Sequence, residues 1–257
     1  MGGEKFAKGD VDQDVSYDLR LKTPFTLIAA GPSRSGKTSW VYSLLSQSSV
    51  LLDRNPHKVF YFYNQWQPLF DRMQREKLVN QFVNHLPDKQ ELEKLTASGK
   101  KSGRGSLCII DDFMNSSSEH VGEIFTALSH HLDLSCIYIT QNLFAQNNKY
   151  MRDMSLSASY LVLFKNPRDQ SQIVNLAKQL APGNTKFIVD SFRHITSQPY
   201  SYVMYDLHQS TPEIIRVRTN LFVHEHPMKV VVPSDGVSKE TSGDNVSKKR
   251  KDEEINQ

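Results

Sequence analysis

Short apolar stretches alternate with amphipathic stretches through the middle of the chain. Five runs are almost wholly apolar and rich in β-branched or aromatic residues, at 25–30, 58–64, 106–112, 136–141 and 160–166. Such runs are typical of parallel strands that are buried on both faces. Helical spacing of apolar residues is found between them, at 88–97, 119–131 and 169–180. The alternation predicts an α/β fold with a doubly wound, mostly parallel sheet.

The same pattern sets the expected limits of the folded region. Residues 1–22 are polar and predict an N-terminal arm, and one domain is expected over residues 23–232. A further helix at 186–196 and a hairpin that pairs 201–206 with 214–218 are expected to extend the sheet. From residue 233 to residue 257 the apolar pattern stops, which predicts a disordered tail.

Composition narrows the class of protein. The chain has 257 residues, of which 38% are hydrophobic and 23% charged, and this balance excludes a disordered or collagen-like chain. No apolar run approaches the roughly 18 residues that cross a bilayer, so no membrane partner is expected. The charged N-terminus, with Phe6 where a myristoylation motif has Ser or Thr, favours an intracellular location. Cys108 and Cys136 both lie in apolar runs and are interpreted as core residues.

The most specific motif joins the first predicted strand to a helical stretch. Residues 31–38 read GPSRSGKT, a complete G-x-x-x-x-G-K-[ST] motif between a strand and a helix, which is the context it requires. Backbone N–H groups of such a loop surround the phosphates of a nucleotide. Lys37 is expected to reach the β- and γ-phosphates, and Thr38 to bind Mg²⁺. The predicted nucleotide site comprises Gly31, Ser33, Arg34, Ser35, Gly36, Lys37, Thr38 and Ser39.

Two adjacent carboxylates end the third predicted strand. In LCIIDD, four apolar residues run into Asp111 and Asp112. The end of a buried strand near a P-loop is where a carboxylate associated with Mg²⁺ lies, so we assign Asp111 to the metal. Asp112 is expected to act as the general base that polarises the attacking water. The predicted strand at 58–64 falls between the two motifs and suggests a P-loop ATPase with an additional strand between the P-loop strand and the acidic strand.

Three further residues are candidates for the catalytic machinery. Gln141 ends the fourth predicted strand, where it could sense the γ-phosphate or orient the water. Arg152, expected in a loop, and Arg168, which follows the fifth strand, are both candidates for an arginine finger. Arg152 is the first choice and Arg168 the second.

The series of motifs resembles a known family. GPSRSGKTS, LCIIDDF, YITQNLF, SLSASYLVLFKNPRD and LAKQLAP together resemble the genome-packaging ATPases of the FtsK/HerA superfamily in DNA viruses and Polinton-type elements, over residues 23–185. The resemblance implies hydrolysis of ATP with Mg²⁺, a homo-oligomeric ring with arginine supplied between subunits, and translocation of double-stranded DNA. A capsid or portal protein would then be a further partner. Asp112 departs from the family, in which glutamate is frequent at this position.

Alternative interpretations remain open from the sequence. A DNA helicase of a virus or mobile element, or a nucleotide-switched binding module, would share the same core motifs. The basic segment at 99–105, with Lys100, Lys101 and Arg104, is expected to be a loop that either contacts DNA phosphates or is a solvated surface. The run KKRK at 248–251 is either a nuclear-targeting signal or part of a charge-balanced tail, so the location could be the host nucleus or the virion.

Overall fold

The computed structural model describes residues 16–111, 113, 118–143, 149–167, 171–225 and 227–232. Within them a nine-stranded mixed sheet has the order β3-β2-β4-β5-β1-β6-β7-β8-β9. The strands from β3 to β6 are parallel, and β7, β8 and β9 continue the sheet antiparallel. Their bounds are β1 (Thr26–Ala30), β2 (Lys58–Tyr63), β3 (Gln81–Val83), β4 (Ser106–Asp111), β5 (Leu134–Thr140), β6 (Tyr160–Phe164), β7 (Tyr202–Asp206), β8 (Val217–Thr219) and β9 (Lys229–Val230).

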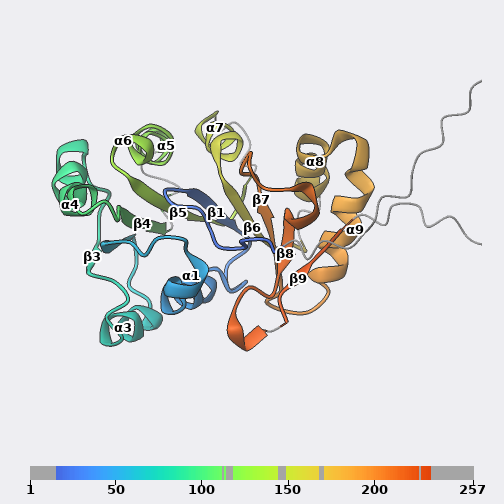
Figure 1. Ribbon diagram of the computed structural model, residues 1–257, viewed down its shortest axis with the longest axis horizontal. Coiled ribbons are helices and arrows are strands. Elements are labelled where there is room, and N and C mark those ends of the chain that lie inside the picture. The colour runs from blue at the N-terminus through green and yellow to red at the C-terminus, as the bar shows by residue number, and fades with distance from the viewer. Residues whose placement is uncertain are drawn as a thin grey trace, which may run out of the picture.

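Helices cover both faces of this sheet (Figure 1). The helices near the P-loop side are α1 (Lys37–Ser46), α2 (Ser48–Leu51) and α3 (Pro68–Arg75). The other face carries α4 (Lys89–Lys101), α5 (Ser118–Glu123), the π-helical turn η1 (Ile124–Leu128), α6 (Ser129–His131), α7 (Lys149–Ser157), α8 (Ser171–Leu180) and α9 (Thr185–Ile195). Short 3-10 turns are η2 (Pro182–Asn184), η3 (Glu213–Ile215) and η4 (Val223–Glu225). The predicted doubly wound, mostly parallel α/β fold is confirmed.

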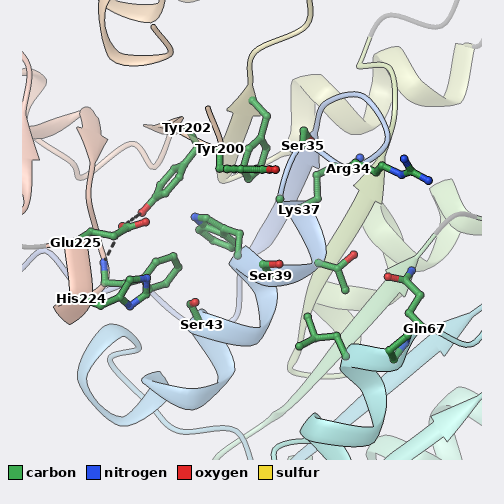
Figure 2. Close-up of a pocket in the computed structure, with 17 residues that line it drawn as sticks. Arg34, Ser35, Lys37, Ser39, Ser43, Gln67, Tyr200, Tyr202, His224 and Glu225 are labelled. Atoms are coloured by element: carbon green, nitrogen blue, oxygen red, sulfur yellow. Dashed lines mark hydrogen bonds between the residues drawn. The ribbon is translucent and has the colours of Figure 1, made fainter. Parts of the chain in front are cut away.

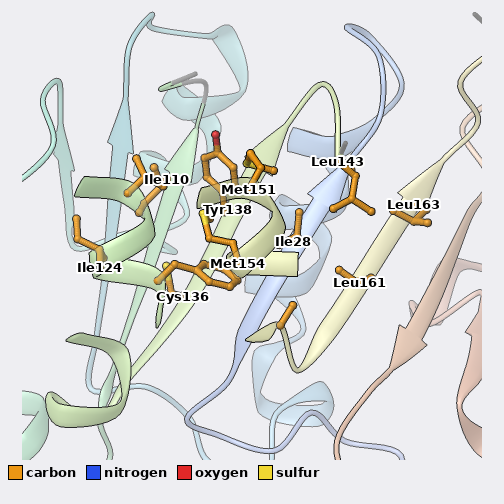
Figure 3. Packing of buried hydrophobic residues seen from close by; sticks show 14 of the residues in the cluster. Ile28, Ile110, Ile124, Cys136, Tyr138, Leu143, Met151, Met154, Leu161 and Leu163 are labelled. Carbon is orange, nitrogen blue, oxygen red and sulfur yellow. The ribbon is translucent and has the colours of Figure 1, made fainter. Parts of the chain in front are cut away.

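Strand residues alternate between two cores because successive side chains point to opposite faces of a sheet. Leu27 and Ala29 pack with Trp40 of α1 on one face. Ile28 packs on the other face, in the core that Figure 3 shows with Tyr138, Met151 and Met154 among its members. Apolar side chains on both faces explain why the strands read as nearly continuous hydrophobic runs.

An additional strand does separate the P-loop strand from the acidic strand in the sheet. That strand is β5, which pairs with β1 on one side and with β4 on the other. The strand expected in this role from its place in the sequence, β2, pairs with the far side of β4 instead. Chain order and sheet order differ because a helical crossover lets a later strand be inserted between two earlier ones.

Several local expectations need correction. The basic segment at 99–105 is not a loop throughout, since Lys100 and Lys101 lie in the last turn of α4. Positive charges are stabilising there because the C-terminus of a helix carries partial negative charge. The helix expected at 119–131 contains the π-helical turn η1. Arg152 lies in α7 and not in a loop. In the predicted hairpin, Ile214 lies in η3, and the second strand begins only at Val217.

Other expectations fall on residues that the structure does not describe, namely 1–15, Asp112, Arg168, the start of the helix expected at 169–180 and the tail at 233–257. At the end of the predicted N-terminal arm, Leu21 is buried, and its backbone N–H donates to Leu51 at 2.8 Å. Across the described ranges, no helix is both long enough and apolar enough to cross a membrane. Cys108 and Cys136 are buried free thiols on paired positions of β4 and β5.

A buried ion pair ties the antiparallel strands to the start of the domain. The Arg218 guanidinium of β8 pairs with the Asp206 carboxylate of β7, and it also donates to the carbonyl of Leu19 at 2.6 Å. Asp206 accepts a further hydrogen bond from Thr211 at 2.9 Å. Burial lowers the pKa of Arg218, and the neighbouring Asp206 charge opposes that shift. The pair joins β8 to β7 and to the segment that precedes β1, and this edge of the sheet carries one wall of the site described below.

Candidate nucleotide-binding site

The loop between β1 and α1 has the backbone shape that its glycines permit. Gly36 is the N-cap of α1 with φ of 105°, and Arg34 is also left-handed with φ of 63°. A Cβ atom on Gly31 would lie 2.7 Å from Cβ of Phe164 and 2.9 Å from Oγ of Ser35, so a side chain there has no room. The loop therefore packs closely against β6, and its backbone N–H groups gather at the N-terminus of α1.

Lys37 lies across this loop. Its ammonium group donates to the carbonyl of Gly31 at 2.6 Å and to the carbonyl of Pro32 at 2.9 Å, and the residue is buried. These bonds hold a positive charge beside the backbone cradle. A phosphate in the cradle would offer the ammonium group an anionic acceptor, which forms a stronger hydrogen bond than a carbonyl does.

Asp111 lies at the end of β4, two strands away from the P-loop strand. Only 5% of the residue is exposed, and its Oδ2 accepts hydrogen bonds from Tyr61 Oη at 2.8 Å and from Gln67 Nε2 at 3.3 Å. Burial, and then the Asp111 charge, raise the pKa of Tyr61 well above its usual value. The hydroxyl group therefore stays protonated and donates, which fixes the orientation of the carboxylate.

The donor set fits a magnesium ion. Mg²⁺ prefers oxygen ligands, keeps several water molecules, and takes only one or two protein ligands in most nucleotide sites. Thr38, in the first turn of α1, and Asp111 supply a hydroxyl and a carboxylate. Gln67 connects the two, since it bonds to Asp111 and lines the same pocket as Thr38. Thr38 and Asp111 are thus the residues that would hold the ion.

A pocket of about 610 Å³ lies over the loop and the first two turns of α1 (Figure 2). One end is formed by the P-loop together with Gln67, Pro68 and Leu69. The other end is formed by aromatic and polar residues from distant parts of the chain. The full lining is Arg34, Ser35, Gly36, Lys37, Thr38, Ser39, Trp40, Ser43, Gln67, Pro68, Leu69, Phe164, Tyr200, Tyr202, Phe222, His224 and Glu225.

The other sequence-derived candidates are placed less closely. Gln141 is exposed directly after Thr140, whose carbonyl accepts a hydrogen bond from the Gly31 N–H at 3.2 Å, so it lies beside the P-loop. Ser33 is exposed and lies outside the pocket lining. Arg152 is exposed on α7, on the opposite face of the sheet from α1. Asp112 and Arg168 lie outside the described residues, and their roles stay predictions.

Sequence reasoning missed two groups of residues at this site. The first is Tyr61 and Gln67, which hold Asp111; a polar residue just after a strand that neighbours the acidic strand was the available signal. The second is the aromatic end of the pocket, with Tyr200, Phe222 and His224. Nothing in its sequence spacing pointed to the P-loop, because β7 and β8 reach the loop only through sheet pairing.

The geometry defines a class of protein. The sheet has an additional strand between the P-loop strand and the acidic strand, and the acidic strand ends in a buried aspartate. A glycine-bounded loop leads into the N-terminus of α1. These features together define a P-loop NTPase fold. No family model and no curated protein matches the sequence.

Solved structures include several similar chains. One is the genome packaging NTPase B204 from Sulfolobus turreted icosahedral virus 2 in complex with ATP-gammaS, at 15% identity and a TM-score of 0.44, covering 81% of this chain and 97% of that one. Another is the cytoplasmic domain of the Type VII secretion ATPase EccC from Thermomonospora curvata, at 12% identity and a TM-score of 0.46, covering 73% of this chain and 24% of that one. A third is Thermomonospora curvata EccC (ATPases 2 and 3) in complex with a signal sequence peptide, at 12% identity and a TM-score of 0.39, covering 58% of this chain and 31% of that one. This chain's own strand order and phosphate loop define its class independently of these likenesses.

Proposed function

We propose that this protein is a Mg²⁺-dependent ATPase that forms a homo-oligomeric ring and translocates double-stranded DNA, with the packaging of a viral genome as its task. The observation that carries the ATPase part is the pocket that Lys37 and the P-loop line together with Gln67, whose amide group donates to the buried carboxylate of Asp111. The DNA-translocating part is supported by the resemblance of the motif series to packaging ATPases. A capsid or portal protein is the further partner that this task requires.

In this proposal each residue has a distinct role. The loop N–H groups bind the phosphates, and Lys37 exchanges its carbonyl partners for β- and γ-phosphate oxygens. Thr38 and Asp111 would hold Mg²⁺, which would supply positive charge that neutralises the same phosphates. Asp112 accepts the proton of the attacking water, and Gln141, beside Gly31, orients that water or senses the γ-phosphate.

The ATPase rate with and without double-stranded DNA tests the proposal. We expect turnover that requires Mg²⁺ and rises when linear duplex DNA is added, because a motor couples hydrolysis to movement along its track. Lys37→Ala serves as the inactive control. A strand-displacement assay on a forked duplex separates the helicase, which would unwind the fork, from a packaging motor, which would move along the duplex without unwinding it.

Two other outcomes would contradict the proposal in different ways. Tight ATP binding without DNA-stimulated turnover would identify a nucleotide-switched binding module. Absence of ATP binding in the wild-type protein would contradict the assignment of a nucleotide-binding site. Association with capsid or portal protein, tested by co-purification from infected cells, would distinguish packaging from other kinds of DNA translocation.

A further inference from the structure

The pocket continues well past the part that a triphosphate would fill. Gln67 lines one end, and because its amide group donates to the Asp111 carboxylate, the metal and the γ-phosphate belong at this end. At the opposite end, Ser39 and Ser43 on α1 face residues that come from β7 and from the segment after β8. Figure 2 shows Tyr202, His224 and Glu225 on the far side of α1 from Gln67 and Arg34. The nucleoside of a bound triphosphate must leave the phosphate loop toward this second end.

Exposed aromatic rings flank the second end. Tyr200 is 74% exposed and left-handed with φ of 64°, and its ring lies against the P-loop, where a Cβ atom on Gly36 would be 3.7 Å from its Cδ1. His224 is also exposed, and its ring is stacked on buried Phe222 with an interplanar angle of 8° and centroids 5.7 Å apart. Exposed ring faces beside a pocket are stacking surfaces for a flat heteroaromatic ring.

A carboxylate in fixed orientation lies beside these rings. Oε2 of Glu225 accepts hydrogen bonds from Tyr202 Oη at 2.7 Å and from the Phe222 N–H at 3.3 Å. Burial, and then the Glu225 charge, raise the pKa of Tyr202, so its hydroxyl remains a donor. Both bonds use the same carboxylate oxygen, and within the described residues Oε1 has no hydrogen-bond partner, so it is available to a ligand in the pocket. A carboxylate oxygen accepts a hydrogen bond from an amino group and repels a carbonyl oxygen.

We propose that the residues Tyr200, Tyr202, Phe222, His224 and Glu225, here called the base subsite, bind the purine base of the nucleotide. The base stacks on Tyr200, and its exocyclic amino group donates to Glu225. The subsite would therefore prefer adenine to hypoxanthine, which carries a carbonyl oxygen in place of the amino group. This inference rests on the proposed nucleotide function for the triphosphate end and adds the residues that select the base.

Calorimetric titration of the full chain with three magnesium-bound probes tests the stacking. The probes are ATP, inosine triphosphate and inorganic tripolyphosphate, which occupies the loop but has no base. Tyr200→Ala is expected to weaken ATP binding about 10-fold, the scale of one base–aromatic stack. It should leave tripolyphosphate binding unchanged, while Tyr200→Phe should keep wild-type affinity for both. Tyr17→Ala removes another exposed tyrosine ring, outside the pocket lining, and is the matched control.

The amino-group contact has its own readout. Glu225→Gln keeps an oxygen that can accept from Tyr202 but removes the charge, so the ratio of inosine triphosphate to ATP dissociation constants should fall toward one. Equal loss of ATP and tripolyphosphate affinity in Tyr200→Ala, or unchanged ATP affinity, would overturn the base subsite while leaving the phosphate site intact. Wild-type protein that binds neither ATP nor tripolyphosphate would instead overturn the proposed function, and the subsite with it.

Discussion

In the proposed site, Lys37 is the residue expected to contribute most directly to nucleotide binding. Lys37→Ala removes the ammonium group that bonds to the Gly31 and Pro32 carbonyls. The loss of this one positive charge is the only change of charge in the variant. Hydrogen bonds to a charged group contribute about 1.5–3 kcal/mol, so the Kd for Mg-ATP should rise at least about 10-fold. Calorimetry measures it, with the exposed Lys229→Ala as control. Wild-type affinity in Lys37→Ala would contradict the phosphate-site assignment.

The two adjacent aspartates should separate binding from chemistry. Asp111→Asn removes a carboxylate that Tyr61 and Gln67 hold in place, so the Mg²⁺ dependence of ATP binding should weaken. Asp112→Asn should bind ATP normally but hydrolyse it roughly 10²-fold more slowly, because general-base assistance is lost. Nucleotide titration at several Mg²⁺ concentrations and a single-turnover assay measure the two effects.

Tyr61→Phe provides the conservative control for Asp111. It keeps the buried ring but deletes the donor to Oδ2, so a higher Mg²⁺ concentration should be needed for half-maximal turnover while kcat at saturation changes little.

If Asp112→Asn hydrolyses ATP at the wild-type rate, the base lies elsewhere. The aspartate at position 112, where the family that the motifs resemble often has glutamate, would then not act as the general base.

At the scale of elements, the parts that local pattern controls were predictable. The core strands read as apolar runs because both of their faces are buried, and the P-loop could be identified because its glycines and Lys37 are contiguous. The short strand β3, the helix α3 and the position of β5 between β1 and β4 were not predictable in this way. Strand order is set by which crossover packs against which face, and that depends on contacts between residues far apart in sequence.

The aromatic end of the pocket illustrates the same limit. Tyr200 approaches Gly36 although the two residues are far apart in the sequence. The contact exists because β7 pairs with β6, which itself pairs with β1. No periodicity within residues 197–225 encodes it. The sequence could therefore locate the phosphate end of the site but not the opposite end.

The edge strands β7 and β8 should depend on their buried ion pair. Arg218→Met leaves the Asp206 carboxylate buried without its guanidinium partner, and breaking such a pair costs about 3–5 kcal/mol of unfolding free energy. The double variant with Asp206→Asn removes both charges and should recover part of that loss. Urea unfolding measures both variants, and Arg72→Met, which breaks an exposed pair with Glu76, is the control. Equal stability of the single and double variants would show that the pair is not the cause.

At the scale of the whole molecule, the proposed ring would bring an arginine of one subunit to the nucleotide site of its neighbour. The residues proposed to bind the phosphates and the metal lie at the ends of β1, β4 and β5. Arg152 lies on α7, in the helical layer on the other face of the sheet. Leu156, one turn later, is 64% exposed. Residues four apart share a face of a helix, so an arginine and a large exposed apolar side chain lie together there. Such a face is suited to contact a neighbouring subunit.

An arginine finger would act only in the assembled ring, because its side chain would reach the site of a neighbouring subunit. A side chain that reaches the γ-phosphate of a neighbour can contribute about 10³-fold or more to turnover, so Arg152→Ala should bind ATP normally and be nearly inactive. Mixing it with Lys37→Ala should restore turnover, because in a ring of equal parts about a quarter of the interfaces pair an intact P-loop with an intact arginine. ATPase assays on the mixture, with affinity tags that demonstrate co-assembly, measure the effect. A co-assembled mixture that stays inactive, or full activity of Arg152→Ala alone, would exclude Arg152 and make Arg168→Ala the variant to mix next.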